Sequence, residues 1–163
     1  MTTTPKKKTT TSVVKLPPNP FIHEILDYVD SQKTQPKKVQ ALQEHRDDSL
    51  TAILIWNFDD RVISAVPEGQ VPYKENEVPV GTDHTSLRRE WKNLYHFIKG
   101  GNDTLSSLRR ETMFIQMLEG LHPEEAKIIC LVKDKNLTEK YKLTREIVAA
   151  AFPDIAWGIH RGT

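Results

Sequence analysis

The chain has 163 residues, of which 37% are apolar and 28% charged, with a formal net charge of +1. This length suits a single domain, and the near-neutral charge argues against a strongly basic nucleic-acid-binding coat. The longest apolar run, residues 52–56, is far too short to span a membrane, so we expect no membrane partner, and the single cysteine, Cys130, fits a reducing cytoplasm.

Residues 1–18 form a basic, threonine-rich segment ahead of a mildly acidic body. Its basic side chains are Lys6, Lys7, Lys8 and Lys15. It has no acidic residue, whereas the rest of the chain carries 19 basic and 22 acidic residues. Such a composition buries too little apolar surface to offset the entropy lost on ordering. We expect a disordered tail; the alternative is a weak, salt-sensitive contact with nucleic acid or an acidic partner.

Residues 19–158 show the periodicity of a helical domain. The first helix is expected to start at Asn19, a typical N-cap residue that a proline follows, and the second at residues 34–36. The third is expected to have its cap among Asp47, Asp48 and Ser49. A buried strand is the alternative for residues 51–58, because β-branched and aromatic residues are frequent there. We favour a helix, since the sequence offers no second strand to pair with it.

Regular periodicity is lost at residues 67–84, where prolines and glycines recur. A loop of this length is usually either packed onto the domain or functional. The interspersed apolar residues, among them Val71, Tyr73 and Val78, favour packing. If the loop instead binds a partner, these three side chains and Trp157 are the candidate partner surface.

Four more helices are expected in the second half of the chain. Their predicted first residues or caps are Thr85, one of residues 102–104, Pro123 and Thr144. The overall prediction is a mainly α, single compact domain of six to seven helices with one long Pro/Gly-containing loop. The domain spans residues 19–158, and residues 159–163 are expected to fray.

The pentapeptide Ser-Leu-Arg-Arg-Glu begins at Ser86 and is repeated 21 residues later. Its arginines are Arg88 and Arg89 in the first copy and Arg109 and Arg110 in the second. If the two helix starts lay side by side, the four guanidinium groups would suit a phosphate or carboxylate. The short connection favours antiparallel helices that separate the two starts, so exposed ion pairs are the preferred interpretation.

The sequence contains no recognisable catalytic, cofactor-binding or metal-binding pattern. Its six histidines are scattered, and residues 122–124 match only part of the zinc deaminase signature, which needs a second cysteine. Residues 100–101 lack the Lys-Ser/Thr of a phosphate-binding loop. Cys130 lies among apolar residues and is expected in the core. We therefore expect no enzyme activity, no cofactor and no metal.

Several short motifs, taken in order, resemble a known family. They are NPFIHE (19–24), WNFD (56–59), VPEG (66–69), PY (72–73), RETMFIQMLE (110–119), LVKDK (131–135) and FPD (152–154). Together they resemble a domain-of-unknown-function family of tailed bacteriophages, notably myovirus-type cyanophages. The resemblance implies a phage product that acts in the host bacterial cytoplasm or in virion assembly, and it supplies no catalytic residues.

The function we expect is that of a non-enzymatic phage accessory protein that binds a protein partner of host or phage. The alternative is weak nucleic-acid binding through the basic tail and the paired arginines. Exposed apolar residues on the fold would favour the first function, and a contiguous basic face would favour the second.

Overall fold

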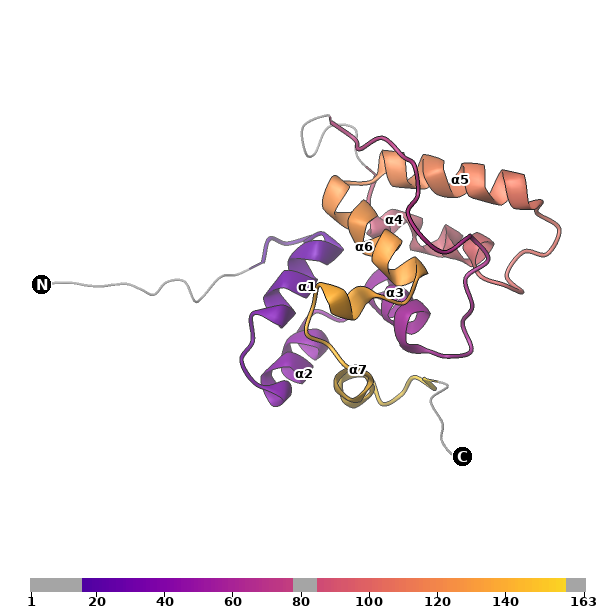
Figure 1. The fold of residues 1–163 in the computed structure, drawn as a ribbon. Helices are drawn as coiled ribbons and strands as arrows, with labels where there is room; N and C mark the ends of the chain where they lie inside the picture. Colours follow the sequence, from indigo (N-terminus) through magenta and orange to yellow (C-terminus); the bar gives the residue numbers. More distant parts are fainter. Residues whose placement is uncertain (1–15, 78–84, 158–163) are drawn as a thin grey trace, which may run out of the picture.

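The computed structural model describes residues 16–77 and 85–157 (Figure 1). These ranges hold seven α-helices and two 3-10 helices and contain no strand. In chain order the elements are α1 (Ile22–Asp30), α2 (Gln35–Glu44), α3 (Asp48–Phe58), α4 (Leu87–Glu90), η2 (Trp91–Phe97), α5 (Ser107–Gly120), α6 (Pro123–Lys133), η3 (Leu137–Glu139) and α7 (Arg145–Ala151). The predicted mainly α, single-domain fold is confirmed.

Some residues that the sequence singles out lie outside the described ranges. They are Lys6, Lys7, Lys8 and Lys15 in the tail, Val78 in the long loop, and the C-terminal residues 159–163.

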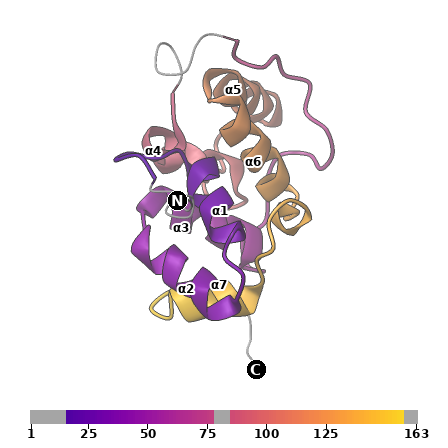
Figure 2. The same ribbon diagram turned by 90° about the vertical axis from the view of Figure 1, so that its left-hand side faces the viewer.

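Helices α3 and α6 pack against each other in the middle of the molecule, and the other elements cover them from two sides. On one side lie α1, α2 and α7, with α2 and α7 side by side (Figure 2). On the other side lie α4, η2 and α5, where η2 contacts both α3 and α5. Both sides and the centre contribute fully buried side chains to one shared core, among them Ile22, Leu42, Leu54, Leu87 and Phe114.

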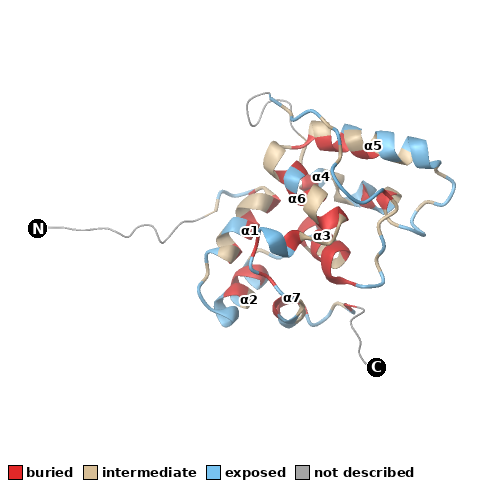
Figure 3. Ribbon diagram, in the orientation of Figure 1, coloured by how far each residue is buried: buried red, intermediate tan, exposed pale blue. Residues whose placement is uncertain are grey.

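Residues 51–58 belong to helix α3, as preferred over the strand alternative. Buried residues occur around most of the circumference of α3 (Figure 3). A helix that is apolar nearly all round belongs in a core. Because its backbone groups bond one another along the helix, α3 needs no partner strand despite its β-branched residues.

The helix N-termini fall into two groups according to the origin of their caps. Thr34, Asp47 and Thr144 accept hydrogen bonds from backbone N–H groups of the helices that they precede, as predicted. Helix α5 is capped by Ser106 rather than by one of residues 102–104. At α1 and α4, however, the residue at the N-cap position provides no side-chain cap.

The caps of α1 and α4 come from Glu125 in helix α6, not from Asn19 or Thr85. The carboxylate of Glu125 accepts hydrogen bonds from Ile22 N (2.8 Å) and from Leu87 N (2.9 Å). Glu125 is fully buried, and burial raises its pKa although the two backbone hydrogen bonds act in the opposite direction. One carboxylate therefore sets the start of two helices that are far apart in sequence.

The described part of the long loop, residues 67–77, is packed onto α5 and α6. The buried ammonium group of Lys133 donates to Pro67 O (2.8 Å) and Gly69 O (3.0 Å). Further along, Lys74 N donates to Glu119 Oε2 (2.9 Å). These contacts hold the loop at two points and agree with the packed interpretation for this part.

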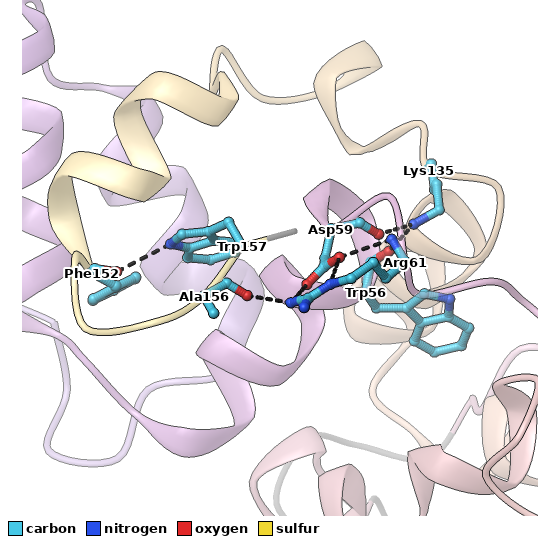
Figure 4. A network of polar contacts seen from close by, with 7 residues as sticks. All are labelled: Trp56, Asp59, Arg61, Lys135, Phe152, Ala156 and Trp157. Carbon is cyan, nitrogen blue, oxygen red and sulfur yellow. Dashed lines mark hydrogen bonds and ion pairs between the residues drawn. The ribbon is translucent and has the colours of Figure 1, made fainter. Parts of the chain in front are cut away.

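The C-terminal segment is tied to the end of helix α3 by a polar network (Figure 4). Arg61 forms an ion pair with the buried carboxylate of Asp59 and donates to Ala156 O. Lys135 donates to the carbonyl oxygens of Trp56 and Asp59. The network therefore satisfies carbonyl groups where α3 ends and fixes the chain that follows α7.

Candidate functional site

The four repeated arginines do not form one anion site. Arg88 donates to Pro20 O (2.9 Å) and pairs with Asp47 (2.7 Å) beside the start of α3. Arg110 donates to His96 O and Asn102 O, both at 2.8 Å, near the end of η2. The two guanidinium groups are thus used for folding at different places.

The other two arginines of the repeat, Arg89 and Arg109, are exposed. Within the described part of the chain, neither side chain makes a hydrogen bond or an ion pair. Of the four arginines, these two are therefore open to a partner, and so is Leu108 of the second copy, which is 78% exposed.

The candidate partner surface is also changed by the structure. Trp157 is buried, at 6% exposure, and its indole N–H donates to Phe152 O (3.1 Å), which removes it from that surface. Val71 and Tyr73 are half-buried and pack against the core. For Val71 and Tyr73 this agrees with the preferred prediction of a packed loop, whereas the placement of Trp157 on a partner surface is wrong, because the burial of a side chain depends on residues far away in the sequence.

Tyr73 and Cys130 share a shallow cavity of about 570 Å³ between the loop and α6. Burial raises the pKa of Tyr73 to about 12, and the neighbouring Cys130 acts in the same direction. Burial also raises the pKa of Cys130. Both groups are therefore protonated at neutral pH, and Cys130 lacks the thiolate character of a nucleophile.

The structure contains a site that the sequence analysis missed, an apolar groove of about 340 Å³ between α3 and η2. We call it the α3–η2 groove. Nine of its ten lining residues are uncharged, and the remaining one is a lysine. The lining residues are Ala52, Ile55, Trp56, Val62, Trp91, Lys92, Leu94, Tyr95, Ile98 and Gly101.

The conformation of η2 places these side chains in the groove. Helix α4 tightens after Glu90 into a 3-10 helix of seven residues, longer than most 3-10 runs. Residues three apart eclipse one another in a 3-10 helix, so Lys92 and Tyr95 lie one above the other, and Ile98 follows η2 in extended backbone. All three line the groove.

The far end of η2 is held in place by neighbouring backbone. Ala65 N donates to Phe97 O (2.7 Å), and Lys99 N donates to Ile63 O (2.8 Å). The chain then turns at Gly101, where a Cβ atom would lie 2.0 Å from Tyr95 O. No other residue permits this close approach, so a glycine is required behind the groove.

One large apolar side chain in the lining of the groove is exposed to solvent, that of Tyr95, at 50%. Ile63 is equally exposed but lines a separate hollow with Lys133 and Asp134. The floor contains Trp56, which is buried and donates its indole N–H to Ser64 Oγ (2.8 Å). A half-exposed aromatic ring beside an apolar hollow makes the groove a candidate contact surface.

Lys92 is the charged residue among those that line the groove. The ammonium group of Lys92 lies 5.9 Å from the ring centroid of Trp91. In the described ranges, the side chains of Arg89, Lys92 and Lys99 take part in no ion pair. Residues 91–98 carry no distinct sequence signal for this site, because Trp91, Leu94, Tyr95 and Ile98 have the spacing of one ordinary buried helix face.

The described residues contain no group of three or more His, Cys, Asp or Glu side chains that could hold a metal ion. None of the helices described is long and apolar enough to cross a membrane.

Comparison with known proteins gives one match. Residues 25–139 match a family of unknown function, DUF6433, and the residues of the α3–η2 groove all lie inside this span. No curated protein and no solved structure matches the chain.

Proposed function

The chain belongs to the DUF6433 family of unknown function, and we propose that it is a non-enzymatic accessory protein that binds another protein. The α3–η2 groove is the proposed contact, and its occupant is an apolar segment of the partner. The order of the sequence motifs supports a phage origin and action in the host bacterial cytoplasm, with virion assembly as the other setting.

The observation that carries this proposal is the pairing of a hollow apolar lining with half-exposed Tyr95. An aliphatic side chain that fills such a groove gains about 1.5–3 kcal/mol from burial. Tyrosine and tryptophan are frequent energetic centres of protein interfaces. Tyr95 and Trp91 therefore give the groove the composition of a protein-binding surface.

Glu125 and Lys135 have shifted pKa values, and each has a structural role. Glu125 caps two helices, and Lys135 binds carbonyl groups at the end of α3. Burial lowers the pKa of Lys135. Perturbed pKa values indicate catalysis when no structural contact explains them, and here the contacts do explain them. This supports a non-enzymatic function.

Weak nucleic-acid binding is the second candidate, and the exposure of Arg89 and Arg109 favours it. Arg88 and Arg110 are bound within the fold, so two of the four arginines of the repeat remain to contact phosphates. Because affinity for nucleic acid scales with the number of phosphates neutralised, this candidate is the weaker one.

Site-specific photo-crosslinking in infected host cells tests the proposal. A benzophenone amino acid replaces Tyr95 in one variant and Lys92 in another, because both residues line the groove and are exposed, with exposed Ala150 on α7 as the control position. We expect the same discrete protein adduct from positions 95 and 92 and none from position 150. The additional change Ala52→Glu, which fills the groove, should remove the adduct.

Two results would contradict the proposal. One is an adduct that is digested by nuclease, which would favour the second candidate. The other is the absence of any adduct that depends on both position and groove. Circular dichroism of each variant shows whether it is folded.

A further inference from the structure

We infer that the partner segment of the α3–η2 groove is acidic, with carboxylates that meet Arg89 and Lys92 while an aliphatic or aromatic side chain enters the groove. This inference deepens the proposed function and rests on it. It specifies the chemistry of the partner, which the apolar lining alone leaves open.

A cationic and an aromatic side chain lie on one side of η2. Lys92 and Tyr95 are three residues apart in η2, and in a 3-10 helix this interval places side chains above one another. Arg89 lies three residues before Lys92 in helix α4, and Ile98 follows η2 in extended backbone and lines the groove. A segment lying along this edge meets positive charge near the junction of α4 and η2 and apolar surface beyond it.

The cations at this edge have no anionic partner within the described ranges. Arg89, Lys92 and Lys99 form no ion pair, whereas Arg88 beside them pairs with Asp47 (2.7 Å). Exposed lysines such as Lys33 and Lys37 are also without an ion pair, but Lys92 differs from them because it lines an apolar groove. Carboxylates of a partner would complement this edge.

The lining of the groove favours an acidic protein segment over a nucleic acid, although both carry negative charge. Single-stranded nucleic acids bind by stacking bases on open aromatic faces. Trp56 is buried in the floor, and the Tyr95 ring lies against the His96 ring, with 4.0 Å between centroids. The groove is completed by aliphatic side chains such as Ile55 and Leu94, which receive a side chain rather than stack a base.

Selection from a displayed library of random peptides tests the inference, with the full chain as bait. A parallel selection uses the Ala52→Glu variant, whose groove is filled. We expect peptides that bind only the unaltered chain to be rich in Asp and Glu next to a leucine, phenylalanine or tryptophan. No enrichment that depends on the groove would contradict the proposed function itself, whereas groove-dependent peptides without excess acidic residues would overturn only this inference.

The affinity of one selected peptide then provides a quantitative test. The double variant Arg89→Gln/Lys92→Gln should bind the peptide about three- to tenfold more weakly, and the difference should shrink at high salt. A version of the peptide with amides in place of its carboxylates should bind both chains equally. The matched control, Lys33→Gln/Lys37→Gln, changes exposed lysines near α2 and should leave affinity unaltered.

A fluorescent single-stranded oligonucleotide is the competing probe. If it binds more tightly than the peptide and the double variant loses that binding, the groove is a nucleic-acid site and the inference is overturned. If the oligonucleotide does not displace the peptide at physiological salt, the inference stands. Equal peptide affinity of the double variant and the unaltered chain would also overturn it.

Discussion

The side of the molecule built from α1, α2 and α7 and the side built from α4 and η2 differ in what surrounds their surface side chains. Between α2 and α7, Arg46 pairs with Asp154, and Gln43 donates to Ala151 O (3.1 Å). At η2, exposed Lys92 and half-exposed Tyr95 line an apolar groove, and Lys92 has no ion-pair partner in the described part of the chain. Where the fold satisfies its own side chains, they serve stability; where it leaves them open, they are available for binding.

The same contrast occurs within the arginine repeat. The two copies are identical in sequence, yet each contains one arginine bound to the fold and one exposed arginine. A repeated motif therefore does not imply a repeated role, because position on the helix and the neighbouring elements decide which side chain finds a partner.

The largest effect on stability is expected from Glu125→Ala, which removes the carboxylate that bonds both α1 on one side and α4 on the other. The change leaves the N–H groups of Ile22 and Leu87 without their buried acceptor, so we expect a loss of about 3 kcal/mol in unfolding free energy. The control is Glu124→Ala at the neighbouring residue, which pairs with lysines at the surface and should cost less than about 1 kcal/mol. Urea denaturation measures both, and equal losses would contradict the capping role.

A smaller, more local effect is expected from Lys133→Met, which removes the buried ammonium group under the loop. The carbonyl groups of Pro67 and Gly69 lose their donor, at a cost of about 2 kcal/mol. Hydrogen exchange should accelerate in residues 67–77 while α1 keeps its protection. Lys127→Met, at an exposed lysine of the same helix, is the control. Unchanged exchange in the loop would show that Lys133 does not hold it.

A matched pair of substitutions tests whether the two arginines of the first copy of the repeat have different roles. Arg88→Gln should lower the unfolding free energy by about 1–2 kcal/mol, because it removes charge-assisted hydrogen bonds to Pro20 O and Asp47. Arg89→Gln, next to it, should alter stability by less than about 0.5 kcal/mol. Thermal unfolding compares them, and equal destabilisation would contradict the division of roles.

The smallest effect concerns the pH dependence of stability at the end of α3. Burial alone would raise the pKa of Asp59, but hydrogen bonds and the charge of Arg61 lower it overall. A depressed folded-state pKa contributes stability above the ordinary value of 3.8, and this contribution is lost as the pH falls through the lower folded-state value. Asp59→Asn should therefore lose less stability than the unaltered chain on acidification below about pH 4, by about 1 kcal/mol. Urea unfolding at a series of pH values checks this, and parallel curves would contradict it.

Much of the helical architecture can be read from the sequence because its signals are local. Thr34, Asp47 and Thr144 cap the helices that follow them, and a cap bonds within three residues. The apolar periodicity likewise extends over a single turn or two. Helix number, most boundaries and the single core follow from such short-range patterns.

The remaining features depend on contacts between residues far apart in the chain. Glu125 bonds Ile22 across 103 residues and Leu87 across 38, so no local pattern reveals that it caps α1 and α4. The start of η2 after Glu90 is equally hidden, because an apolar run such as residues 91–98 fits an α-helix as well as a 3-10 helix.

The candidate site follows the same rule. Sequence alone identified the cations Arg89 and Arg109 but placed the apolar contact at Val71, Tyr73, Val78 and Trp157. The tertiary structure decided that Trp157 is buried and that Tyr95 is half-exposed. The physical reason is that exposure is a property of what packs around a side chain, and those neighbours come from α3 and from the backbone at residues 63–65, which lie far from η2 in sequence.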